Sequence, residues 1–274
     1  MFPLLVLAAS LSADPAEVKY AKPEYLVEAA EASAKTYRIY DVRKKADYEE
    51  GHIPGSFHLV AGPWSKAIND DKADAKFWSK ALAEAGFEPK AKHLIVAEDI
   101  KDACRVWWTL KLAGVPHVAV LNGGWTAYAA AKLDVSKEAV APKVAEPHDW
   151  TPTDRHLKKS EIVKWAEGKL PGIIDARGAK EYGDGRIPTA TMLEWSDLID
   201  SKTKKFKPAA ELKTLIDDRK IDLSKPCATY CQGGGRASVL AFGLELMGAK
   251  DVKNYFRSWG EYGSDADTPK EKSK

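Results

Sequence analysis

The sequence predicts an α/β protein made of two tandem copies of one domain, each with a mostly parallel sheet flanked by helices on both faces. One observation is a self-similarity at a constant offset of 134 residues, without a gap. A second is that short apolar runs of strand length alternate with helix-forming segments in each half. A third is a cysteine and glycine-rich loop that only the second half carries.

The repeat is defined by identical residues at equivalent positions. Both halves contain an Asp-x-Arg triplet, then a tyrosine, then Gly-x-Ile-Pro, and both close on a tryptophan and a tyrosine. So many matches at one offset indicate a duplicated domain. The matching pairs include Asp41 and Asp175, Arg43 and Arg177, Tyr48 and Tyr182, Gly51 and Gly185, Trp125 and Trp259, and Tyr128 and Tyr262.

The elements of each half follow one another in the same order. A first strand is followed by a short polar helix, a brief strand, a helix, the central strand, an apolar helix and a last strand. Because strands alternate with helices, the sheets should be parallel, with ligands at the carboxyl ends of the strands. The expected segments are strands at 37–42 and 172–175, near Leu59 and Leu193, at 93–97 and 227–230, and at 118–121 and 252–255, with helices at about 75–85, 208–218 and 237–247.

The domain boundaries follow from composition. The first copy should span 20–133 and the second 156–268. Residues 134–155 are rich in proline and charge and lack apolar periodicity, which predicts an extended linker. Residues 269–274 are expected to form a flexible tail.

The amino-terminal residues 1–13 resemble part of a secretory signal. They are apolar and end in small residues, but they lack a basic region and are too short to span a bilayer. We therefore expect an exported or periplasmic protein, with a cytoplasmic protein as the alternative.

Composition excludes several classes of partner. The 274 residues are 45% hydrophobic and 30% charged, and 42 basic residues nearly balance 40 acidic ones. Such a balance gives no electrostatic reason to bind nucleic acid or a membrane surface. We expect neither partner, and we expect a monomer.

The segment from Tyr230 to Ser238 contains the candidate catalytic residues. Cys231 ends an apolar run, three glycines and Arg236 follow, and a helix-forming run comes next. Backbone N–H groups converge in such a loop, and the helix amino terminus adds partial positive charge. Both would stabilise a thiolate, which is the nucleophilic form of cysteine. A strand-end cysteine is more often an inert core residue, but the glycines and the arginine favour the functional interpretation.

The first half serves as an internal control. Ala97 and Asp102 stand where the second half has Cys231 and Arg236. Only the second half should therefore be catalytic. Cys104 and Cys227 are expected to be buried core thiols, and no cysteine or histidine spacing resembles a metal site.

In combination, these motifs resemble the tandem-domain rhodanese sulfurtransferases over about residues 20–268, including the closing segment from Ser258 to Gly263. The resemblance implies that the Cys231 thiolate takes the outer sulfur of a small anionic donor such as thiosulfate. The persulfide then passes that sulfur to a thiophilic acceptor such as cyanide. It implies no metal and no organic cofactor. The N–H groups expected to cradle the persulfide belong to Gln232, Gly233, Gly234, Gly235, Arg236, Ala237 and Ser238.

Four side chains have individual expected roles in or near the site. Arg236 is expected to bind the anionic end of the donor and to stabilise the thiolate, with a salt bridge at the helix start as the alternative. Asp175 should fix the backbone of the loop, because Asp41 persists in the inactive half. Arg186 and Trp195 are weaker candidates for lining the pocket.

The donor is predicted from departures from the family pattern. Mercaptopyruvate-using relatives carry a Cys-Gly-Ser-Gly type of loop and an arginine where this chain has Glu181. A carboxylate there would repel an α-keto acid, which favours thiosulfate over 3-mercaptopyruvate. The loop also lacks a second basic residue that some thiosulfate enzymes have.

Two other functions would use a similar loop. Cysteine phosphatases of the same fold place their arginine one position further from the cysteine, so a phosphatase is disfavoured. A non-catalytic persulfide carrier is kept as an alternative function, and turnover with cyanide would distinguish it from an enzyme.

Overall fold

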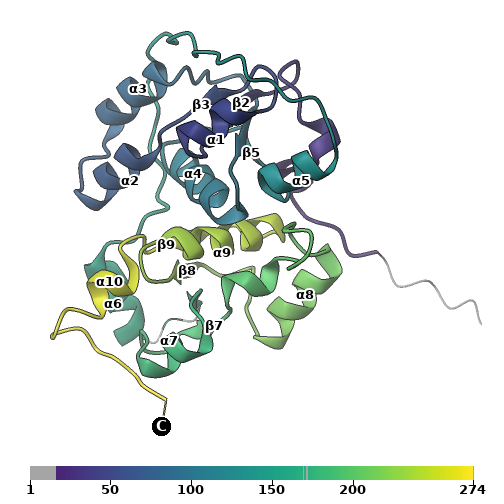
Figure 1. Ribbon diagram of the computed structural model, residues 1–274. Coiled ribbons are helices and arrows are strands. Elements are labelled where there is room, and N and C mark those ends of the chain that lie inside the picture. Colours follow the sequence, from purple (N-terminus) through teal and green to yellow (C-terminus); the bar gives the residue numbers. More distant parts are fainter. Residues whose placement is uncertain (1–16, 169, 171, 274) are drawn as a thin grey trace, which may run out of the picture.

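The computed structural model describes residues 17–168, 170 and 172–273, and it contains two parallel sheets with helices around them (Figure 1). The first sheet has the strand order β1-β5-β4-β2-β3. Its strands are β1 Leu26–Val27, β2 Arg38–Asp41, β3 Phe57–His58, β4 His93–Val96 and β5 Val118–Leu121. The accompanying helices are η1 Pro23–Tyr25, η2 Ala29–Glu31, α1 Lys45–Glu50, α2 Gly62–Asn69, α3 Ala75–Glu84, α4 Ile100–Leu112 and α5 Gly124–Ala130.

The second sheet repeats the first with the strand order β7-β6-β8-β9. Every pairing in both sheets is parallel. Its strands are β6 Ile173–Asp175, β7 Thr191–Met192, β8 Cys227–Tyr230 and β9 Val252–Asn254. Its helices are α6 Lys159–Glu167, α7 Ala179–Asp184, η3 Trp195–Leu198, α8 Ala209–Asp218, α9 Gly235–Leu246 and α10 Ser258–Tyr262.

The predicted fold class is confirmed, and the two domains differ mainly at their edges. Strand β1, which sequence reasoning did not predict, is only two residues long and adds an edge to the first sheet. Helix α9 begins at Gly235, two residues before the expected start, because Gly234 takes a left-handed conformation (φ 84°) as its N-cap. The helix therefore starts inside the glycine loop.

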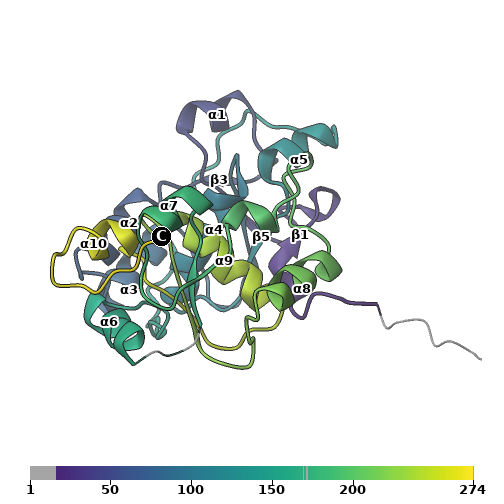
Figure 2. The same ribbon diagram turned by 90° about the horizontal axis from the view of Figure 1, so that it is seen from below.

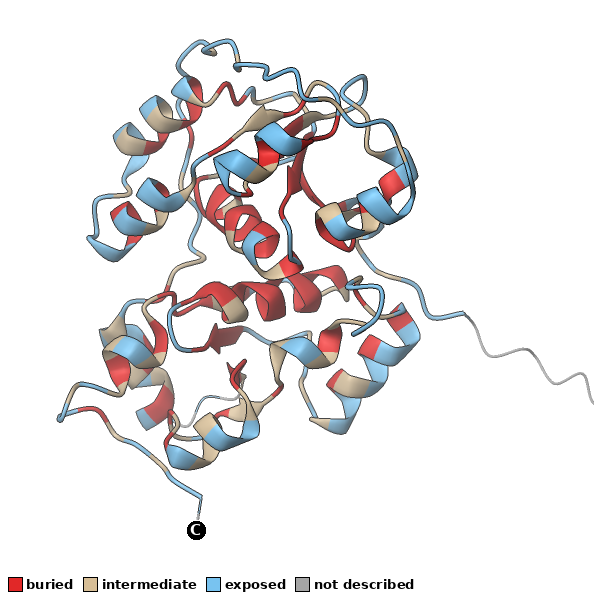
Figure 3. Ribbon diagram, in the orientation of Figure 1, coloured by how far each residue is buried: buried red, intermediate tan, exposed pale blue. Residues whose placement is uncertain are grey.

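The two domains meet through α4 and α9, which lie against each other in both views (Figure 1, Figure 2). Both helices are largely buried (Figure 3). Trp108 of α4 stacks on Phe256 of the second domain, with ring centroids 4.9 Å apart and planes 7° apart. Trp107 meets Phe242 of α9 edge-on at 4.8 Å. The hydrophobic core is thus continuous across the interface.

Residues 134–155 run along the first domain without a named helix or strand. The backbone of Ser136 bridges that of His52, and Thr153 donates an N–H to the carbonyl of Leu112. These contacts hold the segment on the surface of the first domain before it enters the second.

The carboxyl-terminal segment differs from the flexible tail expected at 269–274. The backbones of Glu271 and Arg186 bridge each other, and the Ser273 N–H bonds to the carbonyl of Gly183. Thr268 is buried and donates its hydroxyl to the carbonyl of Tyr262. Backbone pairing with the α7 region therefore fixes residues up to 273, which composition alone does not reveal.

The possible signal segment 1–13 lies outside the described residues. Within the described part of the chain, no helix combines the length and apolar character needed to cross a membrane.

Candidate active site

Strand β8 delivers Cys231 to the carboxyl edge of the second sheet. The strand lies between β6 and β9, and Cys231 follows its last residue, Tyr230. This is the edge at which parallel α/β sheets bind ligands. The thiol is 2% exposed and lies in the continuous core beside the first domain.

Helix α10 orients the peptide groups of the loop. The Trp259 N–H bonds to the carbonyl of Cys231 and the Gly260 N–H to that of Gln232, both at 2.9 Å. In a trans peptide the carbonyl and the next N–H point in opposite directions. The N–H groups of Gln232 and Gly233 therefore point to the side of the loop away from α10. They are available to an anion on that side.

Ser258 is a site residue that sequence reasoning missed. It is fully buried, and its Oγ accepts the N–H groups of Cys231 at 3.0 Å and Gly234 at 3.2 Å. The same oxygen lies 3.9 Å from the Cys231 sulfur and donates to the carbonyl of Tyr255. Its repeat partner is Gly124, so comparing the two copies at offset 134 could have found it.

The expected persulfide cradle, Gln232 to Ser238, has fewer available N–H groups in the structure than the sequence predicts. The Ser238 N–H bonds to the carbonyl of Gly234 as the first hydrogen bond of α9, so it cannot serve the thiol. The Gly234 N–H donates to the Oγ of Ser258. Among the described residues, five N–H groups of the loop have no hydrogen-bond partner: those of Gln232, Gly233, Gly235, Arg236 and Ala237.

In the first copy a carboxylate of the chain itself occupies the equivalents of two of these donors. Asp99, the N-cap of α4, accepts the N–H groups of Lys101 at 2.9 Å and Asp102 at 3.1 Å. The equivalent of Asp99 in the second copy is Gly233, which has no side chain. The first copy thus caps its helix, whereas the second copy leaves the equivalent N–H groups, those of Gly235 and Arg236, free for an external anion.

Arg236 is engaged by a carboxylate in the structure. Its two terminal nitrogens bond to the two oxygens of Glu181 on α7, at 2.6 and 2.8 Å. The hydrogen-bonded Glu181 raises the pKa of Arg236, and the nearby Cys231 sulfur adds to this effect. Arg236 in turn lowers the pKa of the Glu181 carboxyl. The salt bridge, which the sequence left as an alternative, is therefore present beside the thiol.

Asp175 anchors the strand that carries Cys231. It is fully buried and accepts the Tyr230 hydroxyl at 2.5 Å and the Nε and Nη2 of Arg177. Burial, followed by the Asp175 charge, holds the pKa of Tyr230 well above its usual range. The Asp41–Arg43 pair repeats the geometry in the first copy. This agrees with an architectural role for Asp175.

The two weaker candidates lie in different surroundings. The Arg186 guanidinium pairs with Glu271 at 3.3 Å, bonds to Ser273 and stacks on Tyr182. Its partners belong to the carboxyl-terminal segment, so we assign it there and not to the pocket. Trp195 begins η3, half buried against the core that contains Cys231, and its N–H bonds to the carbonyl of Ala176.

The other two thiols are buried away from charge partners that would ionise them. Burial raises the pKa of Cys227 to about 12 and that of Cys104 well above its usual range. Within the described residues, no group of three or more histidine, cysteine, aspartate or glutamate side chains is arranged to hold a metal.

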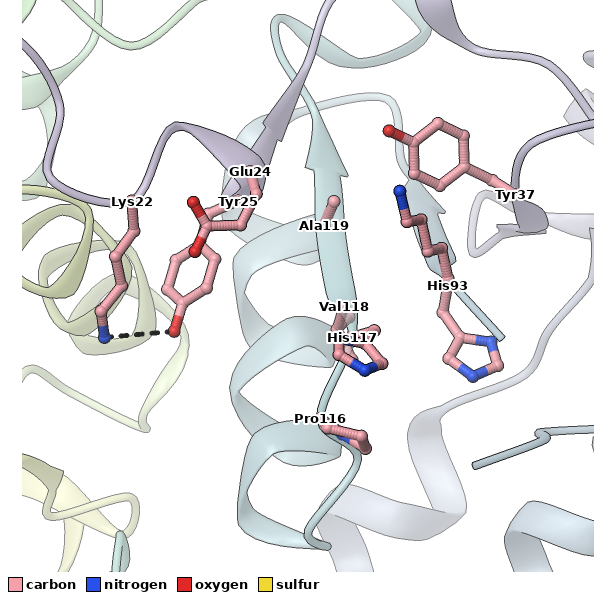
Figure 4. A pocket seen from close by; sticks show the side chains of 10 residues that line it. Lys22, Glu24, Tyr25, Tyr37, His93, Pro116, His117, Val118 and Ala119 are labelled. Atoms are coloured by element: carbon pink, nitrogen blue, oxygen red, sulfur yellow. Dashed lines mark hydrogen bonds between the residues drawn. The ribbon is translucent and has the colours of Figure 1, made fainter. Parts of the chain in front are cut away.

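A separate cavity of about 280 Å³ lies in the first domain (Figure 4). It is lined from the opposite, amino-terminal ends of β4 and β5, by His93 and Val118, and by Tyr25, whose hydroxyl accepts a hydrogen bond from Lys22. Because these are the amino-terminal ends of the strands, the cavity is distinct from the Cys231 site.

The site places a cysteine just before a helix start, on a duplicated parallel-sheet fold. The pattern of the family described as "Rhodanese-like domain" matches residues 23–131 and again 158–265. The chain therefore belongs to the rhodanese-like domain family and holds two copies of its domain.

Similar proteins include two named sulfurtransferases. The chain is 27% identical to the 3-mercaptopyruvate sulfurtransferase of Escherichia coli (strain K12) over 82% of its own length and 85% of the relative. It is 28% identical to the thiosulfate sulfurtransferase of Pseudomonas aeruginosa over 85% and 90%. These relatives support a sulfurtransferase activity and differ in the donor that they name.

Solved structures share the fold. SseA from Escherichia coli, described as a 3-mercaptopyruvate sulfotransferase, superposes with a TM-score of 0.71 at 22% identity, covering 86% of this chain and 98% of that one. The anaerobic ergothioneine biosynthesis enzyme from Chlorobium limicola gives a TM-score of 0.77 at 21% identity, covering 93% and 72%.

Proposed function

We propose that this chain is a sulfurtransferase that takes sulfane sulfur from thiosulfate onto Cys231 and passes it to a thiophilic acceptor. The observation that carries the proposal is the set of free N–H groups in the loop that follows Cys231; the first copy occupies two of the equivalent groups with Asp99. Such donors stabilise negative charge on a thiolate, on a persulfide and on a departing sulfite.

The proposed cycle has two balanced steps. The Cys231 thiolate attacks the outer sulfur of thiosulfate, a new sulfur–sulfur bond forms, and the old one breaks with its electron pair leaving on sulfite. An acceptor such as cyanide then attacks the terminal sulfur of the persulfide. Thiocyanate leaves, and the Cys231 thiolate is regenerated. Covalent catalysis of this kind gives ping-pong kinetics.

The Glu181–Arg236 pair favours thiosulfate over 3-mercaptopyruvate. The carboxylate of 3-mercaptopyruvate would be bound best by two N–H donors of one guanidinium. Glu181 already occupies the two terminal nitrogens of Arg236. Comparing the two donors at the same cyanide concentration tests this preference. A higher kcat/KM with 3-mercaptopyruvate would contradict it.

Mass measurement of the intact protein tests the covalent step. The reduced protein mixed with thiosulfate should gain one sulfur atom, and Cys231→Ala should gain none. Cys227→Ala, which removes a buried thiol from the same strand, is the matched control and should load normally. Continuous thiocyanate production in the presence of cyanide distinguishes an enzyme from a carrier, which would load once and stop. Sulfur loading that persists in Cys231→Ala would refute the proposal.

A further inference from the structure

The first domain places an arginine directly over the catalytic loop. Arg105 of α4 packs against Gly235, the first residue of α9. A Cβ at Gly235 would lie 2.3 Å from Nη2 of Arg105 and 3.0 Å from its Nε. Gly235 is not in the left-handed region, unlike Gly234. The absence of a side chain at Gly235 therefore lets the Arg105 guanidinium lie against the start of α9, and a Cβ there would displace it.

The Arg105 guanidinium has no carboxylate partner in the described part of the chain. Its Nε is buried without a hydrogen-bond partner, and within residues 17–168, 170 and 172–273 the side chain takes part in no ion pair. Asp102 lies one turn earlier on the same helix without pairing with it. Arg236, the cation of the loop itself, is neutralised by Glu181. The guanidinium that lies against the start of α9 without an ion pair among the described residues thus belongs to the first domain.

A cavity adjoins this guanidinium. It has a volume of about 200 Å³ and lies at the carboxyl end of β2 and the starts of α2 and α4, the side of the first domain that carries Arg105. Its walls combine apolar groups with a hydroxyl, one carboxylate and the guanidinium. The residues include Val42, Ala61, Ser65, Asp102, Arg105 and Val106.

We propose that Arg105 binds the anionic end of the sulfur donor, so that the first domain supplies the donor-binding cation for chemistry on the second. The inference rests on the proposed function. Arg236 then stabilises negative charge on the sulfur of Cys231. Arg105 binds the sulfonate group of thiosulfate and the sulfite that leaves. A guanidinium suits this task because its planar donors match the oxygens of an oxyanion. Arg105 also supplies the second positive charge that the loop lacks.

The test compares two donors that differ by one negative charge. Thiosulfate is a dianion and methanethiosulfonate a monoanion, and both carry a transferable outer sulfur. The rate of sulfur loading on Cys231 is measured by quenched mass spectrometry for the wild type, Arg105→Gln and Arg105→Lys. Lys45→Gln, which removes one exposed positive charge from α1, is the control for net charge.

Loss of a charge-assisted hydrogen bond to the donor should lower the loading rate constant of Arg105→Gln with thiosulfate about 10- to 100-fold. The loss with methanethiosulfonate should be smaller, and inhibition by sulfite should weaken. Arg105→Lys should fall between the wild type and Arg105→Gln, and Lys45→Gln should match the wild type.

Two results separate the inference from the function on which it rests. If the wild type loads sulfur but Arg105→Gln and Arg105→Lys load both donors at the wild-type rate, the inference fails and the sulfurtransferase stands. If the wild type itself gains no sulfur, the proposed function fails. Thermal unfolding shows whether each variant is folded. Should Arg105→Gln not fold, an unchanged thiosulfate rate and sulfite inhibition in Arg105→Lys would still overturn the inference.

Discussion

At the scale of single residues, Ser258 shows how backbone strain is combined with chemistry. Its φ is 57°, a region that side chains other than glycine rarely adopt. The equivalent Gly124 has φ 60° and needs no side chain. Keeping a serine in this conformation costs roughly 1 kcal/mol. The Oγ that fixes the N–H groups of Cys231 and Gly234 accounts for its presence.

Replacing Ser258 by alanine or glycine separates these two effects. Both variants leave the Cys231 and Gly234 N–H groups without their acceptor, which should lower kcat/KM with thiosulfate about 10-fold or more. Ser258→Gly should nevertheless be more stable than Ser258→Ala by about 1 kcal/mol, because glycine tolerates the positive φ. Steady-state kinetics and chemical denaturation measure the two quantities. Equal stability of the two variants would argue against strain at this position.

Glu181 is expected to weaken donor binding. In Glu181→Gln the negative charge beside Arg236 disappears and the guanidinium is freed, so KM for thiosulfate should fall. The stability of the protein should change by less than about 1 kcal/mol because both partners are partly exposed. Asp47→Asn, the change at the equivalent position of the first copy, is the control and should leave KM unchanged. A higher KM in Glu181→Gln would contradict this electrostatic account.

At the scale of elements, α4 and α9 are equivalent helices of the two copies, and they differ at their amino termini. Asp99 caps α4, and Gly233 leaves α9 open. The backbones differ as well, because Asp99 caps α4 in an extended conformation and Gly234 caps α9 in the left-handed region, one aligned position later. The carboxylate of Asp99 satisfies N–H groups that otherwise attract an anion.

Gly233→Asp should therefore convert the loop of the second copy toward that of the first. The new carboxylate should bond to the N–H groups of α9, raise stability by about 1 kcal/mol and slow sulfur loading from thiosulfate at least 10-fold. A Cβ at this position meets no atom within 4 Å, so Gly233→Ala is a suitable control for the side chain itself. Equal loading rates in the two variants would show that the free N–H groups do not bind the donor or the persulfide.

At the scale of the whole molecule, the site depends on the contact between the domains. The Trp108–Phe256 stack packs Phe256 against Gly234, whose missing Cβ would lie 2.5 Å from the ring. Arg257 of the second domain pairs with Asp71 of the first at 2.6 Å. The first domain, although it lacks a thiol at the active position, therefore shapes the loop that holds Cys231.

The stability of the whole molecule should fall in mild acid because of His93 in the first domain. Burial lowers the pKa of His93 from 6.5 to about 4. Below pH 6.5 the unfolded chain binds a proton that the folded chain does not, so stability is lost as the pH falls from 6.5 toward 4. His93→Gln should remove up to about 3 kcal/mol of this loss. Denaturation curves at several pH values measure it, with His148→Gln on the exposed linker as control. Parallel pH profiles for the wild type and His93→Gln would exclude this role.

Much of the fold could be predicted because it depends on local patterns. The apolar runs of β4 and β8 and the matched Asp-x-Arg and Gly-x-Ile-Pro motifs define strands, turns and the repeat. The edge strand β1 was missed because two residues carry too little periodicity. The packed carboxyl-terminal segment was missed because backbone pairing between Glu271 and Arg186 leaves no mark on composition.

The sequence by itself determined the duplicated α/β architecture and singled out Cys231 as the candidate nucleophile. Both follow from residues that are neighbours in the chain or that differ between two aligned copies. Only the tertiary structure decided how charge is arranged around that thiol. It shows Arg236 paired with Glu181, Ser258 beneath the loop and Arg105 against Gly235. These partners lie 24 to 130 residues from the loop residues that they meet, and only folding brings them together.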